Sequence, residues 1–165
     1  MPPTPLDPWL VSIQDGFMEA ARRIRNTRHT EALPQVFVID VAARDIAFVP
    51  LDVLMRAPPK QWPRLLAPLV EGVPRIDAVV VVVNEAWLAI PTSTADSLAR
   101  MAAFGHGVRV SEMPDRKEAI MCRLETRGGA QRLLWAFIED GRAGPVEEVP
   151  GETTGPAVGF FAGRR

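Results

Sequence analysis

The hydrophobic positions near the start of the chain repeat at the spacing of an α-helix. They form one stripe: Leu10, Ile13, Phe17, Ala21 and Ile24. This spacing predicts an amphipathic helix with one face against a core. Asp7 and Pro8 stand where such a helix would begin, as the N-cap and the first helical residue.

β-branched and aromatic residues then predict strands at 35–42 and 45–49, and most strongly at 76–90. Residues 79–83 are five consecutive valines, so both faces of the third strand are apolar, which is typical of a central strand. One face is expected to lie under the first helix. The other needs a cover, either the proline-rich segment or a second copy of the chain.

Six prolines between residues 50 and 74 exclude one long helix in this segment. A short helical turn at 51–56 and a second helix near Pro63 are expected instead. The apolar face of the second helix would be Trp62, Leu65, Leu66, Leu69 and Val70.

Residues 118–127 and 131–139 predict a β-hairpin around Gly128-Gly129, which suits a two-residue turn. That turn sets three cross-strand pairs on one face: Leu124 with Leu133, Cys122 with Trp135, and Ile120 with Phe137. Glu125 would oppose Arg132 on the other face. Cys122 is therefore expected to be a buried small hydrophobe and not a nucleophile.

The complete pattern predicts a single α+β domain at residues 1–150. Its centre is a mainly antiparallel sheet of about five strands, on which the N-terminal helix and the short proline-rich helical segment pack. The long connection 91–114 contains a helical stretch at 95–104, and residues 146–149 suggest a short edge strand. Residues 151–165 are expected to form a flexible tail, from which Val158, Phe160 and Phe161 could dock.

Composition narrows the functional classes. The formal net charge of −1 gives no bias toward nucleic acid or anionic membranes. One cysteine excludes an internal disulfide and a Cys-rich zinc site. No apolar run approaches the length of a membrane helix, and the first ten residues lack the pattern of a signal peptide, so a cytoplasmic location is expected.

The candidate chemistry lies at the end of strand 76–90. By alternation, Glu85 and Trp87 share a face with Val79, Val81 and Val83. Residues 114–118 open the next strand and would lie nearby, so Arg116 could pair with Glu85 and anchor the loop. Alternatively, the carboxylates Glu85, Asp115 and Glu118 could bind a cation or act as general acid and base.

These residues also carry a resemblance. Glu-Ala-Trp at 85–87 closes an apolar strand, and Pro-Asp-Arg-x-Glu at 114–118 opens another. Over residues 76–139 this resembles a group of uncharacterised bacterial and phage-encoded proteins. The resemblance implies a bacterial or mobile-element setting and no particular activity.

Two other features each allow a structural and a functional interpretation. His106 stands between two glycines and is expected to be a surface histidine, with a proton shuttle or a metal ligand as the alternative. The basic run Arg22, Arg23, Arg25 and Arg28, followed by His29, reads as a solvated helix end, or as a contact for phosphate or an acidic protein.

The sequence favours a non-enzymatic binding or interaction protein that self-associates or binds a protein partner, because no catalytic signature occurs and one strand is apolar on both faces. Trp87 and Arg116 are the candidate binding residues. The alternative is a small hydrolase-like enzyme that uses Glu85, Asp115 and Glu118, with His106 as a further candidate and with or without a divalent ion. Nucleic-acid binding through the basic run is a third reading. No cofactor follows from the sequence.

Overall fold

The computed structural model describes residues 5–28, 34–58, 61–88, 92–149 and 160–161. In chain order the larger elements are α1 (Pro8–Arg28), β1 (Gln35–Asp40), β2 (Asp45–Phe48), α2 (Leu51–Leu54), α3 (Trp62–Gly72), β3 (Ala78–Leu88), α4 (Thr94–Gly105), β4 (Lys117–Thr126) and β5 (Gln131–Glu139). Two short strands follow, β6 (Arg142–Ala143) and β7 (Glu147–Val149). None of the described helices combines the length and the hydrophobicity that crossing a membrane requires.

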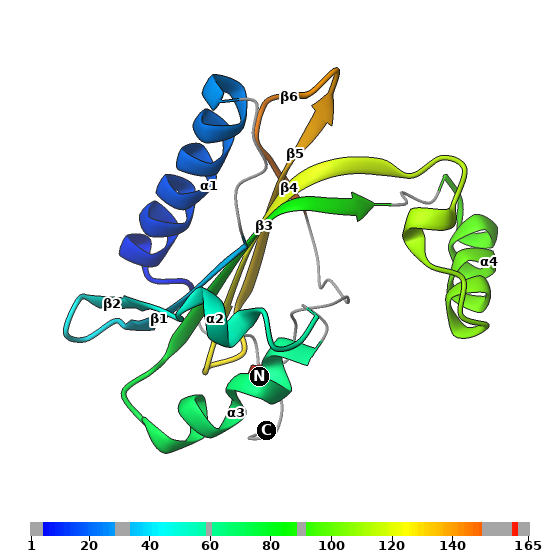
Figure 1. The fold of residues 1–165 in the computed structure, drawn as a ribbon. Helices are drawn as coiled ribbons and strands as arrows, with labels where there is room; N and C mark the ends of the chain where they lie inside the picture. Colours follow the sequence, from blue (N-terminus) through cyan, green and yellow to red (C-terminus); the bar gives the residue numbers. More distant parts are fainter. Residues whose placement is uncertain (1–4, 29–33, 59–60, 89–91, 150–159, 162–165) are drawn as a thin grey trace.

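The strands form one antiparallel sheet in the order β2-β1-β3-β4-β5-β6, and β7 also pairs with β5 (Figure 1). The predicted α+β class and the antiparallel sheet are therefore confirmed. The described residues contain seven strands, more than the expected five, because β6 and β7 are short additions beside β5.

α1 covers one face of the sheet (Figure 1). It packs Leu10, Met18 and Ala21 against Val80 and Val82 of β3 and other residues of this core. Gln14 lies in the middle of this helix face and is fully buried. Its amide nitrogen donates to the carbonyl oxygens of Cys122 at 3.0 Å and Arg132 at 2.9 Å, so a polar residue belongs to a stripe that looked wholly apolar.

The proline-rich segment covers the other face. α2 and α3 contribute Leu54, Trp62, Leu66 and Val70 to a second core that contains Val79 and Val81. The Trp62 indole N–H donates to the carbonyl oxygens of Leu54 and Ala57, each at 3.0 Å, and so ties α3 to the end of α2. The sequence left two covers open for this face, the proline-rich segment and a second copy of the chain. In the structure the proline-rich segment covers it.

Phe160 and Phe161, from the segment expected to be a flexible tail, are also buried in this second core. The backbone N–H of Phe161 donates to the Glu125 carboxylate at 3.2 Å. The guanidinium carbon of Arg127 lies 4.9 Å from the centre of the Phe161 ring. Val158 lies outside the described residues.

The register predicted for the β4–β5 hairpin is wrong by one residue. Cys122 pairs with Leu134, Leu124 with Arg132, and Glu125 with Gln131, so the predicted Glu125–Arg132 pair does not form. The hairpin closes between Thr126 and Ala130: the Thr126 N–H donates to the Ala130 carbonyl oxygen at 2.9 Å. The connection is therefore three residues long with Gly129 at φ 90°, which is the turn with a glycine bulge.

This shift moves half of the expected face to the other side of the sheet. Ile120, Cys122 and Leu124 remain beneath α1. Leu133, Trp135 and Phe137 pair instead with Arg123, Met121 and Ala119 on the opposite face, because a slip of one residue inverts every side chain of a strand. The two-residue turn occurs next along the chain, at Asp140-Gly141, where φ is 52° and 76°.

Gly129→Ala is expected to destabilise the protein by about 1–2 kcal/mol, because a Cβ is disfavoured in the left-handed region. Nothing lies within 4 Å of the added carbon, so the cost is that of the backbone alone. Gly128→Ala is the matched control, since Gly128 does not have a positive φ. Urea unfolding of both variants measures the difference, and equal stabilities would contradict the assigned turn.

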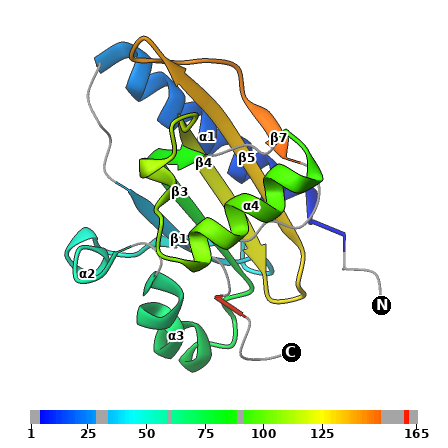
Figure 2. The same ribbon diagram turned by 90° about the vertical axis from the view of Figure 1, so that its right-hand side faces the viewer.

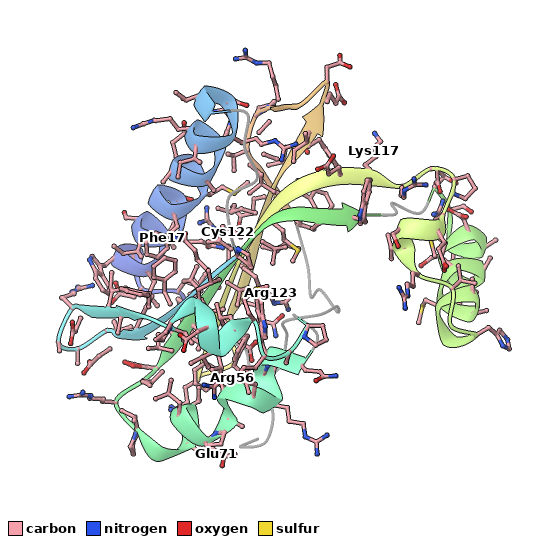
Figure 3. All side chains as sticks on the ribbon, viewed as in Figure 1. Phe17, Arg56, Glu71, Lys117, Cys122 and Arg123 are labelled. Carbon is pink, nitrogen blue, oxygen red and sulfur yellow. The ribbon has the colours of Figure 1, made fainter. Side chains whose placement is uncertain are left out.

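Cys122 is fully buried, as predicted, and lies in the core beneath α1 (Figure 3). Burial raises the pKa of its thiol to about 12. We therefore expect a thiol reagent at mildly alkaline pH to modify native protein only as fast as it unfolds, and denatured protein at once. Immediate modification of the native protein, followed by mass spectrometry, would show that this face is open.

Candidate functional site

An arm, defined as residues 92–116, joins β3 to β4 and extends beyond the covered part of the sheet (Figure 1). It contains α4 and a short 3₁₀ turn, η2 (Val110–Glu112). Figure 2 looks onto the arm and shows α4 crossing in front of the strands. α1, α2 and α3 lie elsewhere, so the arm is not part of either core layer.

The charged side of α4 is turned toward the rest of the arm. Arg100 Nε donates to Asp96 at 2.8 Å, and its two Nη atoms donate to both carboxylate oxygens of Asp115, one of them at 3.0 Å. The Arg100 side chain is 19% exposed. Arg100 therefore fastens one side of the helix to the segment that leads into β4, in the two-pronged geometry that suits guanidinium and carboxylate groups.

The apolar side of α4 is turned to solvent. Leu98 is 63% exposed and Met101 is 68% exposed. Ala95 and Ala102, at neighbouring positions of the same stripe, are exposed as well. A surface helix normally buries its apolar stripe and exposes its charges, and α4 does the reverse because its charges are held inward.

The end of β3 differs from the expected alternation. The ladder to β4 shifts between Val83 and Ala86, which marks a β-bulge at residues 84–85. Trp87 consequently pairs with Glu118 and lies on the α1 face, so its predicted placement beside Val79, Val81 and Val83 is wrong. Trp87 is 41% exposed.

Two cations at the start of β4 lie over aromatic rings of the neighbouring strands β3 and β5. The Arg116 guanidinium carbon lies 5.1 Å from the centre of the Trp87 ring, and Arg116 also donates to the Met113 carbonyl oxygen at 3.2 Å. Lys117, at the outer end of β4 (Figure 3), lies 5.2 Å from the centre of the Phe137 ring. Both candidate binding residues, Trp87 and Arg116, therefore contact each other at the base of the arm.

Two of the three candidate carboxylates are held by different arginines. Asp115 binds Arg100, whose hydrogen bonds hold the pKa of Asp115 below its usual 3.8. Glu118 lies 3.6 Å from Arg25 of α1. The side chain of Glu85 lies outside the described residues, so its pairing with Arg116 remains a prediction. Among the described side chains, no three His, Cys, Asp or Glu residues are grouped as a metal site.

The basic run at the end of α1 fastens the helix to the β5–β6 region. Arg22 Nε donates to the Gly144 carbonyl oxygen at 2.6 Å, and Arg25 Nε donates to that of Gly141 at 3.4 Å. Arg23 is exposed, whereas the side chain of Arg28 and all of His29 lie outside the described residues. Two of the four arginines thus serve the fold.

His106 is exposed in the turn after α4, and Gly107 there has φ 89°. Beside this turn, a hollow of about 340 Å³ lies between α4 and η2, lined by Ala99, Ala103, Val108 and Met113 as well as by the Arg100–Asp115 pair. Arg100 and Asp115 at its wall bind each other, and the carboxylate of Glu112, which also lines it, accepts the Arg109 N–H at 2.7 Å. Among the described residues, the apolar stripe of α4 is therefore the more accessible surface of the arm.

The sequence predicted the helix at 95–104 but not which side it would expose. That side depends on Asp115, which is distant in sequence from Asp96 and Arg100. The available signal was the low charge of α4, whose sequence contains one acidic and one basic residue.

No protein-family model, curated protein or solved structure matches this chain.

The Arg100 ion pairs are expected to fasten the arm above acidic pH. Hydrogen bonds from Arg100 lower the pKa of both Asp96 and Asp115 from 3.8. Their contribution is therefore complete above that value and is lost as the pH falls through the lowered pKa of each group. Hydrogen-exchange protection of α4 should stay constant from about pH 7 to pH 5 and fall at lower pH, after correction for intrinsic exchange.

Asp115→Asn should reduce the protection of α4 at neutral pH and weaken its dependence on acid. Amides of β4 are the internal control, because they belong to the central sheet. Unchanged α4 protection in this variant would show that other contacts hold the arm.

Proposed function

We propose that this protein is a non-enzymatic interaction protein that binds a protein partner through the apolar stripe of α4. The observation that carries the proposal is the reversed orientation of the helix, with Leu98 and Met101 63% and 68% exposed. Arg100 and its two carboxylate partners hold that orientation in place. Exposed apolar stripes of this kind are typical of interaction sites.

The chemistry of the stripe suits a groove on another protein. Burying a leucine or methionine side chain contributes about 1.5–3 kcal/mol, and small residues such as Ala95 and Ala102 permit close approach of a neighbouring element. Leu98 and Met101 are spaced as the anchors of a helix that lies in a groove. The charges of α4 are paired within the arm, so binding should depend little on salt.

A membrane surface fits the stripe less well. Helices that lie on anionic membranes carry several basic residues on their polar face, whereas α4 contains only Arg100, and that residue is paired. A cytoplasmic location is part of the proposal, as is the bacterial or mobile-element setting implied by the resemblance.

The alternative, a hydrolase-like enzyme, requires Glu85, Asp115 and Glu118 to converge on one substrate or ion. The ion pairs of Asp115 with Arg100 and of Glu118 with Arg25 weigh against free carboxylates at neutral pH. The contacts of Arg22 and Arg25 with the β5–β6 region similarly weigh against a nucleic-acid surface. The arrangement therefore favours binding over catalysis.

Site-specific photo-crosslinking in the native host tests the proposal. A photoreactive residue at position 101 should give a discrete protein adduct, whereas the same residue at position 55 should not. Met55 is the matched control because it is 67% exposed, against 68% for Met101, and caps the C-terminal end of α2, away from the arm. Identical adducts from both positions, or none from position 101, would contradict the proposal.

Leu98→Ser should weaken binding of the crosslinked partner by about 10- to 100-fold, the loss expected for one buried leucine. The free energy of unfolding should change by less than about 0.5 kcal/mol, because the side chain is exposed. Titration of the purified partner, with thermal unfolding as the control, separates lost binding from lost folding.

A further inference from the structure

Phe160 and Phe161, the aromatic pair, are the only residues beyond β7 that the structure describes, and both are buried. They lie beside α3 and the end of the β4–β5 hairpin (red in Figure 2). The surface that receives them, the aromatic socket, consists of Val70, Ile76, Glu125 and Arg127. The pair therefore contacts the body of the protein as a short peptide ligand contacts its site.

Glu125 of β4 recognises the backbone of the pair. Its carboxylate accepts the Phe161 N–H at 3.2 Å, although only 4% of Glu125 is exposed. A carboxylate buried in a core is costly unless it is paired and hydrogen-bonded. Arg123, two residues earlier on the same face of β4, is close enough to Glu125 for their charges to interact. Because the bond from Phe161 comes from a backbone group, any residue other than proline can provide it.

Arg127 recognises the side chain of the pair. Its guanidinium carbon lies 4.9 Å from the centre of the Phe161 ring, within the range of cation–π attraction. Hydrogen bonds to the body of the protein hold this guanidinium: Nε donates to the Ile76 carbonyl oxygen at 3.0 Å, and Nη2 donates to that of Val70 at 3.1 Å. Neither acceptor belongs to the pair, so the body of the protein positions the guanidinium, as in a pre-organised site.

We infer that the socket is a recognition site for a segment of a partner protein that carries two adjacent aromatic residues, and that the chain's own pair occupies it as an internal ligand. The pair itself shows the chemistry that the socket takes: a backbone N–H for Glu125 and an aromatic ring beside Arg127. Arg127 Nη1 is buried and meets no acceptor among the described residues. A partner segment with a carbonyl or carboxylate oxygen at this position would use that donor.

Competition determines when a partner can enter the socket. The pair is joined to β7 by residues 150–159, and a tether of this kind gives an effective concentration of about a millimolar. A free segment competes against that value, so the natural chain should bind it weakly and a chain without the pair should bind it well. The inference goes beyond the interaction of the arm and uses none of the arm's residues.

Fluorescence anisotropy with a labelled synthetic peptide tests the inference. The peptide has the sequence of residues 155–165, and the protein is the full chain with Phe160→Ala and Phe161→Ala. We expect the peptide to bind this variant at least about 10-fold more tightly than it binds the natural chain, because the internal ligand no longer competes. A peptide with both phenylalanines replaced by alanine should not bind. Equal affinity for the variant and the natural chain, or none for the folded variant, would overturn the inference.

A second variant allows for the stability that is lost with two buried rings. Phe160→Leu with Phe161→Leu keeps most of the buried apolar volume but places no ring beside Arg127. The phenylalanine peptide at about 1 mM should displace the leucine pair and raise the melting temperature of this variant, whereas the alanine peptide should not. Equal melting temperatures with the two peptides would show that the pair is ordinary core and overturn the inference.

Glu125→Gln shows where the peptide binds. In the alanine variant it should weaken peptide binding by about 10-fold, because the hydrogen bond loses its charged acceptor. Glu139→Gln is the matched control, since Glu139 is exposed at the end of β5. Equal effects of the two changes would place the peptide elsewhere and overturn the socket. Leu98→Ser should leave peptide binding unchanged, so failure of the arm proposal and failure of the socket give different results.

Discussion

Five successive valines in β3 impose the architecture of this protein, because both faces of that strand must be removed from water. Val80 and Val82 require one cover and receive α1, whereas Val79 and Val81 require another and receive α2 and α3. A sheet with a helix layer on each side follows from this requirement. The prolines of the second layer limit α2 and α3 to short helices, which still supply Leu54, Trp62, Leu66 and Val70 to the core.

Local signals were sufficient to predict this central part. The valine run marked the central strand, Asp7 marked the start of α1, and its side chain does accept the Trp9 N–H at 2.8 Å. The same signals missed Gln14, since a polar residue on an apolar stripe gives no indication of its buried hydrogen bonds. The carbonyl oxygens that it binds, those of Cys122 and Arg132, belong to strands far along the chain.

Register was harder to predict than the presence of strands. Gly128-Gly129 accommodates either a two-residue or a three-residue turn, and the two differ by one residue in every pair that follows. Apolar residues occupy both faces of β5, so alternation did not distinguish the registers, and only the closure between Thr126 and Ala130 does. The bulge near Val83 was equally hard to predict. Nothing in the local composition indicates where the β3–β4 ladder shifts, and that shift places Trp87 on the α1 face.

The two covering layers also determine where apolar surface remains. α1, α2 and α3 pack over the middle of the sheet and stop short of both ends, at β2 on one side and at the arm on the other (Figure 1). Phe48 stays exposed because β2 is the last strand, and Met101 stays exposed because Arg100 holds the opposite side of α4. Which side chains stay exposed in the arm depends on contacts between residues that are not neighbours in sequence, such as Arg100 with Asp115. The surfaces that remain apolar are therefore the ones that periodicity describes least.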